Sequence, residues 1–290
     1  MKRIVTGLAL ATAATLVTAG PAQAAAPKNP VVAVKKQMVA GKGVTFAERV
    51  TVFEGRERAV FLRRTGTYQF KSSGIAASDI TAKFNIKASD LGEDADSEVG
   101  KMLTTPERSI TVGRTSYLSG GIWDSIMTEG ETWYKVDGPV HGGFTAVYGQ
   151  PLNVVGEPAT LKTLLKGAKP AAGGYTGRIT LGELRKVSPW FKASMLGQRA
   201  KAKTAKSVLS WKLTVDAKGL PTRLVTTLPA AALGMSGAKD EGFSIDTRYS
   251  GWGAKVSIKA PSADEVATDL KKGAELPTDL QEIPLGSIVQ

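Results

Sequence analysis

Few residues of this chain are of the types that carry out catalysis or bind metals. The chain has one histidine and no cysteine. The histidine lies in a glycine-rich stretch, His141-Gly-Gly143. A metal centre normally takes several imidazole, thiolate or carboxylate ligands, so a lone histidine indicates a loop residue. We therefore expect no bound metal and no cofactor.

A serine nucleophile would need partners that the sequence does not supply. Gly234-Met-Ser-Gly-Ala238 lacks the final glycine of the G-x-S-x-G motif, and His141 precedes Ser236, opposite to the chain order of that fold. Ser236-Gly-Ala-Lys239 matches S-x-x-K, but the companion motifs S-D-N and K-T-G are absent. We therefore expect a protein that is not an enzyme, and an enzyme using two carboxylates is the remaining alternative, although no such pair stands out.

An acidic cluster is the other candidate for chemistry, because carboxylates bind calcium. Its members are Asp90, Glu93, Asp94, Asp96 and Glu98. Aligned with an EF-hand loop from Asp94, the sequence has Val99 where glycine is required and Thr105 where the bidentate glutamate belongs. The spacing therefore does not predict an EF-hand. No phosphate-binding glycine motif and no nucleic-acid motif occurs, so we expect no nucleic-acid partner.

The first residues have the pattern of a secretory signal peptide. Lys2 and Arg3 precede an apolar run from Ile4 to about Val17, and Ala22-Gln23-Ala24 is a small-x-small cleavage pattern. The run is shorter than the roughly 20 residues that span a bilayer, which disfavours a transmembrane anchor. A lipid anchor would need a cysteine, and the chain has none. We expect a secreted, extracellular protein that is not lipid-anchored.

The chain is strongly basic, with 38 Lys and Arg against 26 Asp and Glu, a formal net charge of +12. Such a charge favours contact with anionic membranes or cell-wall polymers. Solubility alone is the simpler interpretation of the same charge.

The C-terminal third predicts an antiparallel sheet closed by a short helix after Pro261. Ser207 to Val215 alternates apolar and polar residues, which is the period of a half-buried strand. Asp216 to Gly219 predicts a turn and Thr222 to Leu228 the returning strand. Phe243 to Tyr249 and Ala254 to Lys259 predict two more strands across a glycine-containing corner.

The preceding chain predicts mostly strands with few helices. The expected strands are 44–53, 58–70, 80–86, 108–112, 115–118, 132–136 and 175–181, and the expected helices or helical turns are 30–39, 122–127, 159–166 and 182–187. Trp190 to Lys206 is a basic connector, either an amphipathic helix that touches a membrane or, as we prefer, a solvated linker.

The predicted helices are too small to cover the predicted sheet. About ten strands ~4.8 Å apart and ~20 Å long present a face on the order of 1,000 Å². Four helices of about ten residues cover at most about 600 Å². The sheet must therefore fill its own interior, or curl into a trough whose apolar floor is left for another molecule.

Several segments resemble the LolA/LppX-like superfamily of bacterial lipoprotein and lipid carriers, especially its secreted and lipid-anchored actinobacterial members. The strongest are Leu213-Thr-Val-Asp-Ala-Lys-Gly-Leu-Pro-Thr-Arg-Leu224, Thr247-Arg-Tyr-Ser-Gly-Trp-Gly-Ala-Lys-Val-Ser-Ile-Lys-Ala-Pro261 and Ala263-Asp-Glu-Val266. The resemblance implies a mainly β, α+β fold, in which a strongly curved antiparallel half-barrel sheet carries a few helices across its concave face. It also implies carriage of acylated molecules without covalent chemistry. This chain lacks the lipobox cysteine of the anchored relatives.

We therefore expect a signal peptide at 1–24, an N-terminal lead and helix at 25–43, a single half-barrel domain at 44–272 and a loosely ordered tail at 273–290.

The expected function is a secreted, monomeric, non-enzymatic carrier of a lipid, lipoprotein acyl group or other hydrophobic molecule. The alternative is an envelope structural or sensory module that binds a protein or an anionic wall polymer through its basic surface. The candidate ligand-binding residues share one strand face: Leu209, Trp211, Leu213, Leu224, Ile245 and Tyr249. Trp133, Trp211 and Trp252 are either core residues or lining residues of the trough.

Overall fold

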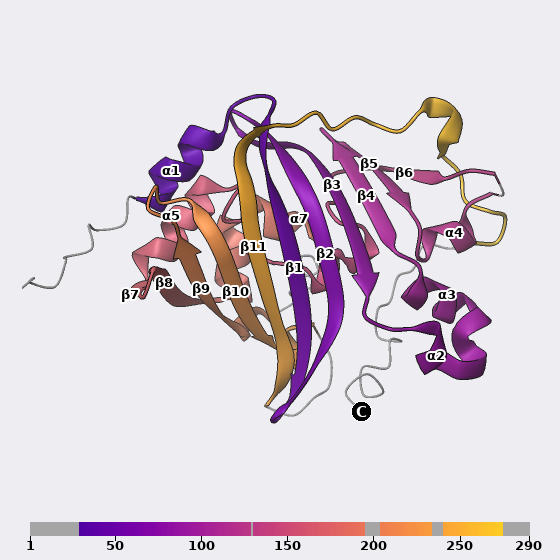
Figure 1. Cartoon of the computed structure of the whole chain (residues 1–290), viewed down its shortest axis with the longest axis horizontal. Coiled ribbons are helices and arrows are strands. Elements are labelled where there is room, and N and C mark those ends of the chain that lie inside the picture. Colours follow the sequence, from indigo (N-terminus) through magenta and orange to yellow (C-terminus); the bar gives the residue numbers. More distant parts are fainter. Residues whose placement is uncertain (1–28, 129, 195–203, 234–239, 275–290) are drawn as a thin grey trace, which may run out of the picture.

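The computed structural model describes residues 29–128, 130–194, 204–233 and 240–274. These residues form a 12-stranded sheet with the strand order β12-β6-β5-β4-β3-β2-β1-β11-β10-β9-β8-β7. The predicted signal peptide, Ser236 and most of the predicted tail lie outside the described residues. Figure 1 shows the sheet face-on, with helices at its back and at one end.

The strands are β1 (Lys42–Glu54), β2 (Glu57–Lys71), β3 (Gly74–Phe84), β4 (Glu107–Val112), β5 (Thr115–Ser119), β6 (Trp133–Asp137), β7 (Lys169–Ala171), β8 (Gly174–Thr180), β9 (Val208–Val215), β10 (Pro221–Pro229), β11 (Glu241–Lys255) and β12 (Val266–Ala267). Neighbouring strands are antiparallel except for the parallel pair β12 and β6. The expected fold class, mainly β with one large, open, curved antiparallel sheet and a few helices, is confirmed.

The helices are short. They are α1 (Pro30–Gln37), α2 (Ala88–Leu91), α3 (Glu98–Thr104), α4 (Trp123–Ile126), α5 (Pro158–Lys166), α6 (Leu181–Val187) and α7 (Pro189–Ala193), with 3-10 turns η1 (Gly92–Asp96), η2 (Phe144–Tyr148), η3 (Thr204–Lys206), η4 (Ala230–Leu233) and η5 (Ala263–Glu265). Within the described ranges, no helix has both the length and the apolar character needed to span a bilayer.

Alternation along each long strand separates a buried face from an exposed one. In β1, Phe46, Val50 and Val52 are buried, whereas Ala47 and Arg49 are exposed. The predicted hairpin between β9 and β10 is confirmed, because Leu213 lies opposite Leu224 and Val215 lies opposite Pro221. One face of the sheet is therefore apolar and covered, and the other meets solvent.

One predicted strand is wrong. The corner at 250–253 does not separate two strands, because β11 continues through it to Lys255. Gly251 and Gly253 adopt φ angles of +65° and +77°, which allow the strand to bend there. The segment 256–262 is then extended but belongs to no strand, and Ile258 donates its backbone N–H to the side chain of Gln69 at 2.7 Å.

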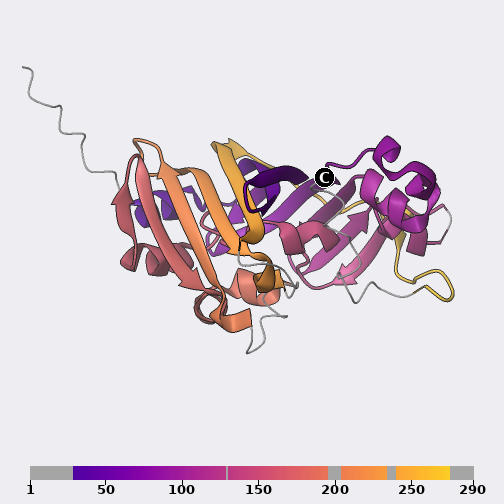
Figure 2. The same ribbon diagram turned by 90° about the horizontal axis from the view of Figure 1, so that it is seen from below.

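The sheet curves, and helices together with an irregular segment cover its concave face (Figures 1 and 2). Helices α1, α5, α6 and α7 lie over the end that contains β7 to β10, while α2, α3 and α4 lie beside the opposite end (Figures 1 and 2). Between them runs an irregular segment, residues 138–157, which we call the covering segment. It connects β6 to α5 and includes η2.

Candidate ligand cavity

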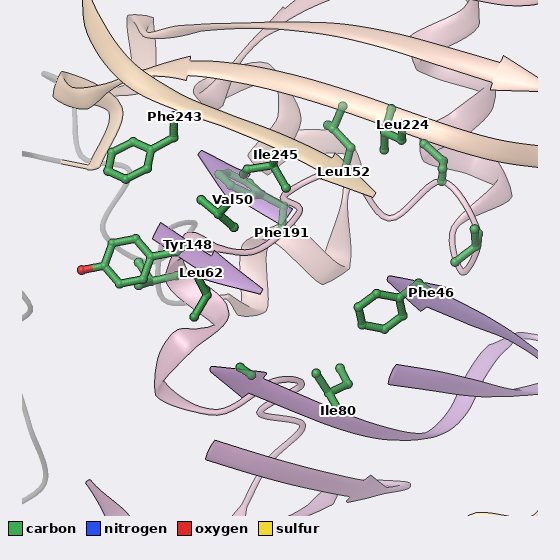
Figure 3. Packing of buried hydrophobic residues seen from close by; sticks show 14 of the residues in the cluster. Phe46, Val50, Leu62, Ile80, Tyr148, Leu152, Phe191, Leu224, Phe243 and Ile245 are labelled. Carbon is green, nitrogen blue, oxygen red and sulfur yellow. The ribbon is translucent and has the colours of Figure 1, made fainter. Parts of the chain in front are cut away.

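The covering segment packs its apolar side chains onto the concave face of the sheet. Its buried apolar side chains are Phe144, Val147, Tyr148, Leu152, Val154 and Val155. The ring of Tyr148 lies edge-on to that of Phe61, with 4.9 Å between centroids. Figure 3 shows Leu152 and Phe191 among the buried sheet residues Val50, Leu224 and Ile245. Much of the apolar sheet face is therefore covered by irregular chain rather than by helices.

The six candidate binding residues do lie together on this face. Leu209, Trp211, Leu213, Leu224, Ile245 and Tyr249 are all buried members of one core cluster. None of them lines the large cavity described below. Their contact with a ligand stays a prediction, and in the structure their neighbours are residues of the chain itself.

Hydrogen bonds to buried side chains fix the covering segment in place. The carboxylate of Glu107 accepts the backbone N–H groups of Phe144 at 2.6 Å and Thr145 at 2.8 Å. Gln150 accepts the hydroxyl of Thr226 at 2.6 Å and donates to the hydroxyl of Thr247 at 3.1 Å. These contacts satisfy polar groups that would otherwise be buried without partners.

A buried ion pair lies at the centre of the same face. Glu48 of β1 lies opposite Arg64 of β2 and Thr247 of β11. Arg64 Nη1 donates to Glu48 Oε1 at 2.7 Å, and the two side chains are 6% and 1% exposed. Thr247 donates to the second oxygen of Glu48 at 2.8 Å. Burial opposes the charge of Arg64, but Glu48, Tyr68 and Glu107 together outweigh burial and leave the pKa of Arg64 above its usual value.

The covering segment can approach Arg64 only because two of its residues are glycines. A Cβ atom on Gly149 would lie 1.7 Å from Arg64 Nη1, and one on Gly142 would lie 2.2 Å from Arg64 Nη2. Either distance is far below van der Waals contact, so the backbone itself packs on the guanidinium group. Arg64 Nε has no hydrogen-bond partner among the described residues.

A cavity of about 620 Å³ remains between the covering segment, β2 and α7. Its volume falls within the range of about 300–1,000 Å³ that is typical of ligand pockets. Most of its lining is apolar or backbone. The lining residues are Arg64, Tyr68, Ser73, Gly74, Ile75, Pro139, Val140, His141, Gly143, Ala146, Gly149, Gln150, Pro151, Asn153, Gly156, Glu157, Pro158, Ala159, Thr160, Pro189, Trp190, Ala193 and Ser194.

One wall of the cavity is an aromatic stack. The rings of His141 and Trp190 are stacked, with centroids 4.4 Å apart and an interplanar angle of 17°. Tyr68 meets Trp190 edge-on at 5.9 Å. His141 Nδ1 and Ser78 Oγ form a hydrogen bond of 2.8 Å. Burial lowers the pKa of His141 to about 4, so its imidazole is neutral at pH 7.

Glu157 connects the starts of α5 and α7 beside this aromatic stack. Its carboxylate accepts the backbone N–H of Trp190 at 2.6 Å and the hydroxyls of Ser188 and Thr160. Burial raises the pKa of Glu157, although these three donors oppose the shift. A carboxyl group that only accepts hydrogen bonds has the pattern of an ionised carboxylate.

The polar groups beside the cavity are held by partners within the chain. Ser78 is fully buried and does not line the cavity, so its bond to His141 orients the imidazole and presents no nucleophile. Both oxygens of Glu157 are occupied by structural donors. Within the described part of the chain, no group of three or more His, Asp or Glu side chains is placed to hold a metal ion.

The remaining candidates take structural positions. The acidic cluster forms α2, η1 and the start of α3, where Ser97 accepts the backbone N–H of Gly100. Trp133 and Trp211 are buried, and Trp252 stacks on Phe70 at 6.1 Å. Trp211 belongs to the core and Trp252 packs against it, whereas the ring of Trp133 lies beneath the guanidinium of Arg108 at 5.5 Å, and none of the three lines the cavity.

The sequence interpretation missed Trp190 and the covering segment. Trp190 was assigned to a solvated connector, but Pro189–Ala193 is a helix whose Phe191 is completely buried. The solvated interpretation is therefore wrong for this part of the connector. Residues 195–203, including Met195 and Leu196, lie outside the described residues. An aromatic pair, Trp190 and Phe191, after a proline was the available signal for a packed helix.

Comparisons with known proteins give only distant likenesses. No protein-family model matches the chain, and no curated protein matches its sequence. A LolA superfamily protein from Nitrosomonas europaea is similar in structure, with 9% identity, a TM-score of 0.34, and coverage of 76% of this chain and 90% of that protein. A DUF1329 family protein from Desulfovibrio piger has 10% identity, a TM-score of 0.32, and coverage of 79% and 92%.

We predict that Gly149→Ala destabilises the protein, whereas Gly167→Ala does not. The new methyl group at 149 would overlap the guanidinium of Arg64, while nothing lies within 4 Å of the corresponding position at 167. Neither glycine has a positive φ, so the comparison isolates the steric effect. Urea denaturation should show a loss of about 1–3 kcal/mol for Gly149→Ala and a change within about 0.5 kcal/mol for Gly167→Ala. Equal midpoints for the two variants would contradict the proposed close approach.

We predict that His141 makes stability fall as the pH is lowered. Its folded-state pKa is about 4, below the usual 6.5, so between these values the unfolded chain binds a proton that the folded chain does not. The free energy of unfolding should therefore decrease from pH 6.5 towards pH 4, by at most about 1.4 kcal/mol per pH unit from this group. Denaturation curves of His141→Gln should lack this part of the pH dependence. Parallel pH profiles for the two proteins would contradict the prediction.

Proposed function

We propose that the protein is a non-enzymatic carrier that shields a lipid, an acyl chain or a similar hydrophobic molecule. The observation that carries the proposal is the cavity of about 620 Å³ beneath the covering segment. It lies between the sheet and short, loop-linked elements, and most of its exposed lining is apolar. The signal-like first residues support release outside the membrane, where a shielded apolar cargo is needed.

The size of the cavity is sufficient for useful affinity. Burying one methylene group is worth about 0.8 kcal/mol, so an acyl chain of ten carbons gains about 8 kcal/mol before ordering costs. Those costs remove several kcal/mol. With costs of about 4 kcal/mol, a ten-carbon chain retains about 4 kcal/mol, which corresponds to millimolar binding, and a chain of about fifteen carbons reaches the micromolar range.

The charges around the cavity favour a ligand with an uncharged polar head. Arg64 is already neutralised by Glu48, Glu107 lies nearby in the same buried network, and Glu157 also lines the cavity. His141 is neutral at pH 7 because its pKa is about 4. A carboxylate or phosphate head would therefore enter a region with an excess of negative charge, whereas an ester or amide carbonyl could accept from a side-chain N–H without that repulsion.

Filling the cavity should abolish binding without unfolding the protein. Ala146 lines the cavity and is partly exposed, so Ala146→Trp would project its ring into the space. We expect Ala146→Trp to bind a neutral solvatochromic probe such as Nile red at least about tenfold more weakly than the unmodified chain. Ala172→Trp, in the exposed turn between β7 and β8, is the matched control and should bind normally.

The unmodified protein supplies the decisive measurement. Native mass spectrometry and solvent extraction of the secreted chain should reveal a retained hydrophobic molecule. Absence of any extracted lipid together with no Nile red binding would refute the carrier proposal. Equal binding by Ala146→Trp and Ala172→Trp would move the site away from this cavity.

A matched pair of ligands tests the preference for an uncharged head. At pH 7.5, the methyl ester of a fatty acid should displace the bound probe at a concentration about fivefold or more below that of the free acid with the same chain. Concentrations should stay below the solubility limits of both ligands. Equal or tighter binding of the free acid would contradict the charge argument while leaving the carrier proposal intact.

The alternative function, an envelope module that binds through its basic surface, is favoured by one separate observation. The solvent-facing side of the sheet concentrates basic side chains, and that surface does not overlap the cavity. A binding surface on the outer face and a cavity on the inner face are compatible with each other.

A further inference from the structure

Basic side chains form a band across the exposed face of the sheet, opposite the cavity. Strand register places Lys83, Arg63, Arg49 and Lys212 in one outward-facing row and Arg108, Arg248 and Arg223 in the row beside it. All seven of these side chains belong to exposed residues. We call them the outer basic band. The band runs from β4 to β9, perpendicular to the strands, on the face that Figure 1 presents to the viewer.

Like charges face one another directly within the band. Arg49 lies opposite Arg63, and Arg63 lies opposite Lys83. Arg223 lies opposite Arg248 on β10 and β11. Adjacent strands are only about 4.8 Å apart, and like charges at directly opposed positions destabilise a sheet. Solubility alone would be served as well by the same charges placed on separate elements.

The acidic residues of this face leave part of the band uncompensated. Asp246 accepts two hydrogen bonds of 2.8 Å from Arg223 and lies 3.7 Å from Arg49. Asp79 pairs with Arg108 in the same bidentate way. In the described parts of the chain, Arg63, Lys83 and Arg248 form no ion pair. These three charges are therefore available to an external anion.

The shape of the face selects among anionic partners. The band follows the direction in which the sheet bends, on its convex side (Figure 2). A flat bilayer touches a convex surface over a limited area, whereas a flexible chain can follow the curve and meet successive strands. Arginine also presents a planar fork that fits phosphate groups bidentately.

We propose that the outer basic band is a docking surface for a flexible linear polymer of phosphate diesters, such as a polyol-phosphate chain. The polymer lies across the strands and places its phosphates against Arg63, Lys83 and Arg248. Neighbouring arginines with carboxylate partners extend the contact at both sides. Binding is electrostatic and therefore falls steeply with added salt. It is independent of whether the cavity on the other face is occupied.

The test compares two variants of the full mature chain with the same net charge. Arg63→Gln, Lys83→Gln and Arg248→Gln are combined in one protein. The matched control combines Lys101→Gln, Lys162→Gln and Lys259→Gln, which are exposed residues outside the band. Affinity for fluorescently labelled poly(glycerol phosphate) is measured between low and moderate salt, and thermal unfolding verifies that both variants fold.

We expect the band variant to bind at least about tenfold more weakly than the unmodified chain and to lose about two units of slope in a plot of log K against log salt. The control should stay within about twofold. Equal weakening by both variants would show that only net charge matters and would overturn the assignment. Tighter binding to vesicles of phosphatidylcholine and phosphatidylglycerol than to the polymer would also overturn it, in favour of a membrane surface.

Discussion

The structure depends on the buried ion pair between Arg64 and Glu48. These charges stand on adjacent strands at positions that alternation otherwise assigns to apolar side chains. Removing two charges from water costs several kcal/mol for each ion unless close partners compensate. The element that covers this part of the sheet must therefore contribute hydrogen-bonding groups and approach closely. Glycines at 142 and 149 allow the covering segment to approach the guanidinium group closely, and Gln150 donates to Thr247, whose hydroxyl in turn donates to Glu48.

The sheet was largely predictable because its signals are local. In β9 and β10, a period of two and a turn ending at Gly219 were enough to place both strands and their pairing. The strand expected at 254–259 does not form as a separate strand, and the reason lies outside its own sequence. Its alternation is genuine, but β1 begins at Lys42, opposite Lys255, so no neighbouring strand remains for the later residues to pair with. Periodicity predicts an extended segment and does not supply its partner.

The cavity was not predictable, because contacts distant in sequence create it. Helices alone are too small to cover the sheet face, but the covering segment also buries aromatic and branched side chains on that face without forming regular structure. Irregular backbone can be buried only where other groups satisfy its N–H and C=O groups. Here the donors of residues 144 and 145 meet Glu107, and Gln150 meets Thr226. No spacing rule connects such positions. For the same reason the position of Trp190 in the cavity wall was not predictable, because its ring stacks on His141, which lies in a different segment.

Within a single strand, a buried charged residue on one face of the sheet can directly precede an exposed basic residue on the other face. In β1, Glu48 points into the buried network while its neighbour Arg49 belongs to the outer basic band. The formal charge of +12 belongs to the chain as a whole and says little about the cavity, whose charged lining residues are Arg64 and Glu157. Because side chains alternate with a period of two, a shift in register by one residue would exchange the faces and bury the arginines. The paired Glu48 and Arg64 oppose that shift, since each would lose a hydrogen-bonded partner of opposite charge. A buried ion pair that is costly to desolvate thus also helps to keep the basic band facing outward.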